Sequence, residues 1–171
     1  MNKKTKTIAF IGLCTSLALV FAYLEAIIPP LFPSLPGVKM GLPNIIIIFL
    51  LYRFGPKTAI TVSLLRIVLV TALFGNAMAM LYSLAGGMLS ILIMIVLKKF
   101  NILSTVGVSI AGGVSHNVGQ IIVAMFVLET TQLAYYLVVL TFSGIVAGVF
   151  IGLAGSVLIK KIPEKLYFTG K

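Results

Sequence analysis

Acidic residues are scarce in this sequence: aspartate is absent, and glutamate occurs only at Glu25, Glu129 and Glu164. A magnesium site is usually built from carboxylates held close together, so three scattered glutamates do not predict one. A single cysteine, Cys14, and a single histidine, His116, exclude a disulfide framework and a tetrahedral metal centre. No GxxxxGK[ST] phosphate loop is present. We therefore expect a protein that is not an enzyme by itself, with no catalytic residue, metal or cofactor.

Charge of either sign is also rare, because only 9 % of the 171 residues are charged while 60 % are hydrophobic. A soluble domain is about 45–50 % apolar and roughly a quarter charged. The mean hydropathy of +1.20 and the recurring apolar runs instead indicate a multi-pass membrane protein. These runs are continuous rather than alternating, which favours helices over a β-barrel. We predict an all-α fold in the cell membrane.

Six helices can be drawn within one integral membrane domain that covers residues 1–171. The first ends at Pro29 and Pro30, and Gly55 with Pro56 separates the second from the third. The second is short for a full crossing. The first is too long for the core of a signal peptide, so we expect it to be retained. The expected helices are 7–28, 43–54, 57–74, 78–97, 104–128 and 133–159.

The basic residues set the expected orientation, since lysine and arginine accumulate on the cytoplasmic side of membrane proteins. With both termini in the cytoplasm, only Lys39 faces outward and Arg66 lies within a helix. In a soluble chain a net charge of +10 would suggest nucleic acid. Here it predicts contact with a lipid bilayer instead, and no nucleic acid partner. The cations expected inside are Lys3, Lys4, Lys6, Arg53, Lys57, Lys98, Lys99, Lys160, Lys161, Lys165 and Lys171.

Polar residues interrupt the apolar runs near mid-membrane depth. Arg66 lies nine residues beyond Lys57, or roughly 13 Å along a helix. A charge at that depth costs about 2.5–3.5 kcal/mol on insertion scales, so it needs a structural or functional reason. His116, Asn117 and Gln120 lie at a similar depth, and their spacing places them on one helical face.

Three further polar residues are expected nearer the outer side: Glu25, Lys39 and Asn44. One interpretation is an internal network, in which Glu25 or helix carbonyls satisfy Arg66. The other is a cavity that binds a small anionic organic solute, because two cations then outnumber one acid. In that cavity His116 would form a hydrogen bond with the ligand or respond to protonation.

Small residues four apart indicate where helices pack closely in lipid. Gly144, Gly148 and Gly152 form such a series in the last helix. We expect this series to pack within the bundle rather than against another chain.

Several segments together resemble a known family. They are LEAIIPP around Glu25, PGVKMGLPN at 36–44, LLRIVLVTALFGN around Arg66, SLAGG at 83–87 and SHNVGQ at 115–120. The chain resembles the membrane family called heptaprenyl diphosphate synthase component I, or Gx transporters. Members of that family are similar to the substrate-binding S components of energy-coupling factor transporters.

The resemblance implies six helices, cytoplasmic termini and an outward-facing pocket capped by a loop rich in proline and glycine. It implies uptake of a vitamin-, flavin-, isoprenoid- or quinone-precursor-like solute, with an energy-coupling membrane subunit and its ATPases as partners. The family name suggests an alternative, a non-catalytic accessory subunit of polyprenyl diphosphate or quinone synthesis beside a soluble prenyl synthase. A structural role in an electron-transfer assembly is a third possibility.

Overall fold

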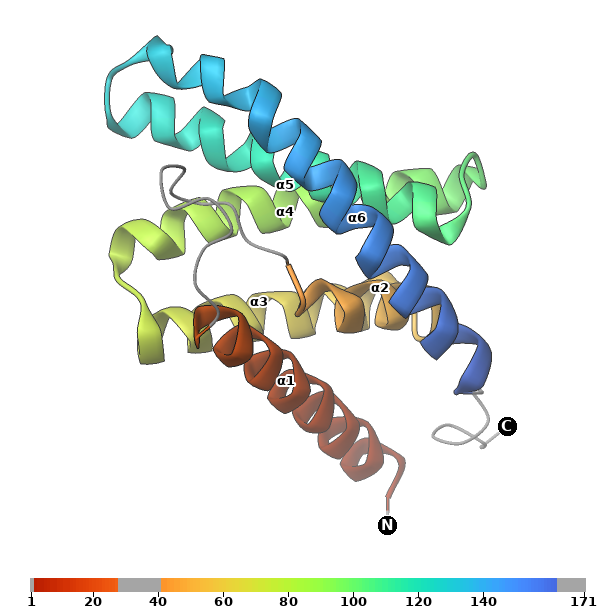
Figure 1. Ribbon diagram of the computed structural model, residues 1–171. Helices are drawn as coiled ribbons and strands as arrows, with labels where there is room; N and C mark the ends of the chain where they lie inside the picture. The colour runs from red at the N-terminus through yellow and green to blue at the C-terminus, as the bar shows by residue number, and fades with distance from the viewer. Residues whose placement is uncertain (1, 28–40, 163–171) are drawn as a thin grey trace.

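The computed structural model describes residues 2–27 and 41–162, and every regular element in these ranges is helical (Figure 1). The all-α prediction is therefore confirmed. The elements are α1 (Lys3–Ile27), α2 (Asn44–Arg53), α3 (Pro56–Phe74), α4 (Ala77–Phe100), α5 (Thr105–Val127), the 3-10 helix η1 (Thr131–Tyr135) and α6 (Tyr136–Lys161).

The helix boundaries lie within a few residues of those expected, and local chemistry explains them. Gly55 adopts a positive φ of 87° before Pro56, which opens α3 at the position that proline favours. The side chains of Asn76 and Ser104 accept hydrogen bonds from the first turns of α4 and α5. Asn101 ends α4 in the left-handed conformation. The last helix starts later than expected, because residues 131–135 form η1.

Five helices of the described chain are long and apolar enough to cross a membrane, which supports a multi-pass membrane protein. The exception to the expected six is α2, which has ten residues and a length of about 15 Å. The hydrocarbon core of a bilayer is about 30 Å thick, so α2 reaches across only half of it. The run of Ile, Phe and Leu predicted the position of this helix. Its length, however, is only half of the thickness of the hydrocarbon core.

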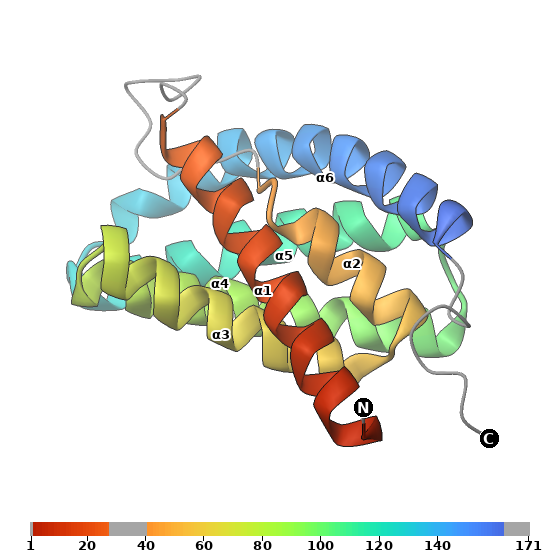
Figure 2. The same cartoon turned by 90° about the horizontal axis from the view of Figure 1, so that it is seen from below.

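The ends of the helices gather into two groups (Figures 1 and 2). One end of the bundle holds the start of α1, the α2–α3 and α4–α5 connections and the end of α6. Arg53 donates a hydrogen bond there to the carbonyl of Ile159, and Lys98 donates to the carbonyl of Leu51 at 2.5 Å. These cations satisfy carbonyls at the C-terminal ends of α6 and α2, where the helix dipole is negative. We call this the basic end.

Helices α4, α5 and α6 approach one another at backbone distance. A methyl group added at Gly113 would lie 2.6 Å from the carbonyl oxygen of Gly144, and one at Gly119 would lie 2.8 Å from that of Ala85. Gly148 and Gly152 also face α5, where an added methyl would lie 2.5 Å from Ile110 Cα and 2.7 Å from Val106 Cα, respectively. These three helices form a closely packed layer.

The centre of the bundle is filled by α2, which lies between α3 and α6 (Figure 2). Its residues Ile46–Leu51 are all buried, which is typical of a helix surrounded by protein on every side. By contrast, α1 buries a narrow stripe that includes Phe10, Cys14 and Ala18, while most of its other residues are exposed.

We predict that Gly148→Ala lowers the free energy of unfolding by about 1–3 kcal/mol, because the added methyl forces α5 and α6 apart. Denaturation of the purified protein by SDS, followed by circular dichroism, measures this change. Gly12→Ala in α1 is the control, since nothing lies within 4 Å of the added atom. Equal stability of both variants and the wild type would contradict the close α5–α6 contact.

Candidate functional site

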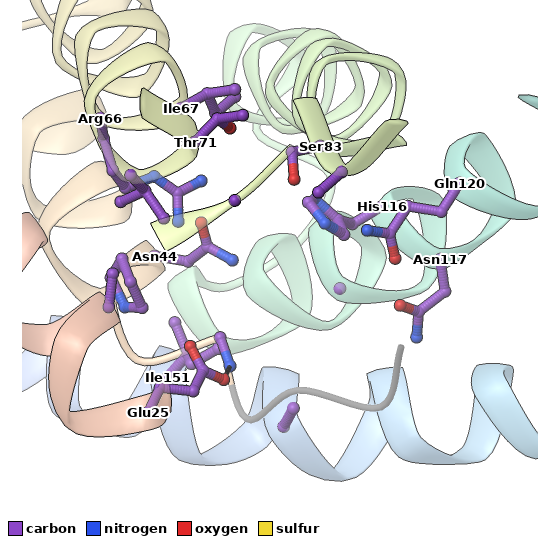
Figure 3. Close-up of a pocket in the computed structure, with 18 of the residues that line it drawn as sticks. Glu25, Asn44, Arg66, Ile67, Thr71, Ser83, His116, Asn117, Gln120 and Ile151 are labelled. Atoms are coloured by element: carbon purple, nitrogen blue, oxygen red, sulfur yellow. Dashed lines mark hydrogen bonds between the residues drawn. The ribbon is translucent and has the colours of Figure 1, made fainter. Parts of the chain in front are cut away.

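A cavity of about 230 Å³ lies in the half of the bundle away from the basic end, and all six α-helices contribute to its lining. It lies at the N-terminal start of α2, beside Gly41, Pro43 and Asn44. The cavity is therefore bounded by the first residues of α2, by α1 and α3, and by the layer of α4, α5 and α6 (Figure 3).

The first residues of α2 face this cavity. Gly41 has a φ of +73°, a conformation that glycine adopts without strain, and its carbonyl accepts the N–H of Asn44 at 2.8 Å. The turn directs the chain into α2, and Gly41, Pro43 and Asn44 all line the cavity. The N-terminal end of a helix carries a partial positive charge, so α2 presents a positive potential to whatever occupies the cavity.

Arg66 extends into the cavity from α3. Its Nε is buried and makes no hydrogen bond within residues 2–27 and 41–162. Glu25 attracts it electrostatically from α1. A buried donor without a hydrogen bond costs about 1–3 kcal/mol, and more for a charged group, so an acceptor that entered the cavity would be stabilised by Arg66.

The opposite wall is formed by α5, which contributes His116, Asn117 and Gln120 (Figure 3). Gly86 of α4 makes this wall possible, because a methyl group there would lie 2.7 Å from the carbonyl oxygen of His116 and 2.8 Å from Cγ of Gln120. Asn117 Nδ2 donates a hydrogen bond to the carbonyl of Leu140 at 2.6 Å. Asn117 therefore links α5 to α6 as well as lining the cavity.

Glu25 lines the cavity from the last turns of α1. Its carboxylate oxygen Oε1 accepts the N–H of Gly41 at 2.5 Å, which ties the end of α1 to the turn before α2. Glu25 and Arg66 are separate on the wall, with Asn44 between them in the view of Figure 3.

The cavity brings together Glu25, Asn44, Arg66, His116, Asn117 and Gln120, all of which the sequence had suggested for a site. Lys39 lies outside the described residues. Two hydroxyl residues that line the cavity, Thr71 and Ser83, were missed. A hydroxyl inside an apolar helix is a weak signal, because it can bond to a carbonyl of its own helix.

The chemistry of this lining suits recognition. It offers the guanidinium of Arg66, side-chain amides and hydroxyls as hydrogen-bond donors, together with the positive end of α2. Such groups orient a polar ligand and stabilise negative charge on it. Apolar surface from α3 and α6, including Ile67, Val70 and Ile151, completes the wall.

We predict that Asn117→Ala lowers the free energy of unfolding by about 0.6–1.7 kcal/mol, the range measured for hydrogen bonds between membrane helices. Denaturation by SDS measures the loss of the bond to Leu140. The control is Ser156→Ala, because Ser156 bonds only to the carbonyl of Gly152 in its own helix among the contacts seen here. If both variants unfold alike, the bond between α5 and α6 does not stabilise the fold.

Comparison with curated proteins returned no match, and comparison with solved structures returned none either. A protein-family model does match, and it is described as heptaprenyl diphosphate synthase component I. The match runs over residues 14–158, from the middle of α1 almost to the end of α6. It therefore includes every described residue that lines the cavity. Because this match covers most of the 171 residues, the chain belongs to the heptaprenyl diphosphate synthase component I family.

Proposed function

We propose that this protein is a non-catalytic membrane component that binds a small, anionic organic solute in the cavity between its six helices and takes part in its uptake. The observation that carries the proposal is Arg66, a cation on the cavity wall whose buried Nε has no hydrogen-bond acceptor in the described chain. Intramembrane ionisable residues usually mark a ligand or ion pathway.

The half-length of α2 supports an anionic ligand. In transporters, broken helices direct their positive N-terminal ends toward anionic substrate groups near the membrane midplane. Roughly 13 Å separates Arg53, at the basic end, from Asn44 at the cavity. Arg66 lies a similar distance from Lys57, so the cation and the positive end of α2 act at the same depth.

The size of the cavity restricts the ligand. Sites for drug-sized molecules occupy about 300–1,000 Å³, and this one measures about 230 Å³. It suits a small solute, or the anionic end group of a longer molecule whose remainder stays outside. A small vitamin- or quinone-precursor-like solute satisfies this limit, whereas a flavin or an isoprenoid diphosphate satisfies it only with one end group in the cavity.

The proposed topology places both termini in the cytoplasm, with the basic end at the inner face of the cell membrane. The whole chain then acts as one membrane domain. In this topology the cavity, which lies away from the basic end, is nearer the outer face, as uptake from outside requires. Kinship with S components, and with it an energy-coupling subunit and ATPases as partners, belongs to this proposal.

A second candidate function rests on the family itself. Component I of a synthase implies a partner subunit, so the chain is then a membrane accessory of polyprenyl diphosphate or quinone synthesis beside a soluble prenyl synthase. The same cavity would hold the diphosphate end of the substrate or product.

Native mass spectrometry of the detergent-purified protein, with extraction of any bound small molecule, tests the proposal. We expect a stoichiometric anionic ligand whose occupancy falls at least tenfold in Arg66→Ala, because a hydrogen bond to a charged group contributes about 1.5–3 kcal/mol. Lys57→Ala is the matched control, since it removes one cation from the exposed start of the same helix.

The identity of the ligand separates the two candidate functions. A water-soluble ligand that is lost in Arg66→Ala and retained in Lys57→Ala supports uptake. A bound isoprenoid diphosphate, or stable association with a prenyl synthase, supports the accessory role. Equal retention in all three proteins would contradict the assignment of Arg66.

A further inference from the structure

Glu25 and Arg66 face the same cavity from different helices, and they are its charged side chains among the described residues that line it. One is negative and the other positive, so these two side chains together carry no net charge. Glu25 already attracts Arg66. An anionic ligand that binds Arg66 therefore approaches a cation that is already partly neutralised by Glu25.

The position of Glu25 is fixed by the backbone. Its carboxylate accepts the N–H of Gly41, which itself leads into the turn before α2. A methyl group added at Gly41 would lie 3.1 Å from both Asn44 Nδ2 and Ile151 Cδ1, so this turn is closely surrounded. Because this hydrogen bond links α1 to the turn, the carboxylate of Glu25 is held at the wall of the cavity.

We propose that Glu25 determines the charge of the ligand that this site accepts. It repels an anion bound at Arg66, and this repulsion grows with the number of negative charges on that anion. Inside a membrane protein the repulsion is screened less than in water. Glu25 thereby favours a singly charged group over a highly charged one. This inference rests on the proposed function, since it assumes that anions bind at Arg66.

Replacing Glu25 with glutamine tests the effect of its charge separately from the effect of its hydrogen bond with Gly41. Glu25→Gln removes the negative charge, yet its amide oxygen can still accept the N–H of Gly41. Glu129→Gln is the matched control, because it changes the net charge of the chain equally at an exposed residue that does not line the cavity.

The experiment uses the full chain in nanodiscs of zwitterionic lipid and measures calorimetric affinities for two probes, acetate and inorganic diphosphate. We expect Glu25→Gln to bind diphosphate at least tenfold more tightly than the wild type, with a smaller gain for the singly charged acetate. Glu129→Gln should bind both probes as the wild type does.

The outcomes distinguish this inference from the function on which it rests. If the wild type binds a probe through Arg66 but Glu25→Gln gains no affinity for diphosphate over acetate, the role of Glu25 is wrong and the anion site stands. If neither the wild type nor Glu25→Gln binds either probe, the anion site itself is wrong. An equal gain in Glu129→Gln would assign the effect to net charge and would also overturn the inference.

Discussion

Helix α2 is only ten residues long and lies between α3 and α6, and the cavity lies at its N-terminal end. Its apolar residues are buried on all sides, so it anchors the centre of the bundle near the basic end. Beyond its first residue the surrounding helices continue, and a cavity remains between them. A helix that begins inside an apolar bundle needs hydrogen-bond partners for its first backbone groups, because apolar surroundings offer none. The turn from Gly41 to Asn44 meets this requirement with its own hydrogen bond and with Glu25.

The basic residues have a structural role in addition to the topological one that their distribution suggests. Arg53 and Lys98 do not simply extend toward lipid head groups, because each donates to a carbonyl at the end of a neighbouring helix. Lys98 also lies over the ring of Tyr52, 5.1 Å from its centre. These contacts join the ends of α2, α4 and α6, so the end of the bundle opposite the cavity is held together by polar contacts as well as apolar packing.

Much of the fold could be predicted from the sequence, because apolar runs and the Gly55–Pro56 break mark helices plainly. The length of α2 was harder to interpret, since the same apolar run is compatible with a thinned crossing. The i, i+3 and i+4 spacing predicted one shared face for His116, Asn117 and Gln120, and all three line the cavity. Residue spacing could not predict which hydrogen-bond partner each polar side chain has. The bond from Asn117 to Leu140 depends on how α5 and α6 are paired, and Thr71 and Ser83 became visible as lining residues only when the helices were assembled.

The helices on the two sides of the cavity differ in how tightly they are packed against the rest of the bundle. On one side, glycines bring the backbones of α4, α5 and α6 into contact, and any relative displacement of these helices meets main-chain atoms. On the other side, α1 is held by a narrow buried stripe, while most of its remaining surface is exposed to the surroundings. A bundle packed in this way resists displacement of α4, α5 and α6 more than displacement of α1, so α1 is the wall whose position can change at the least cost in packing.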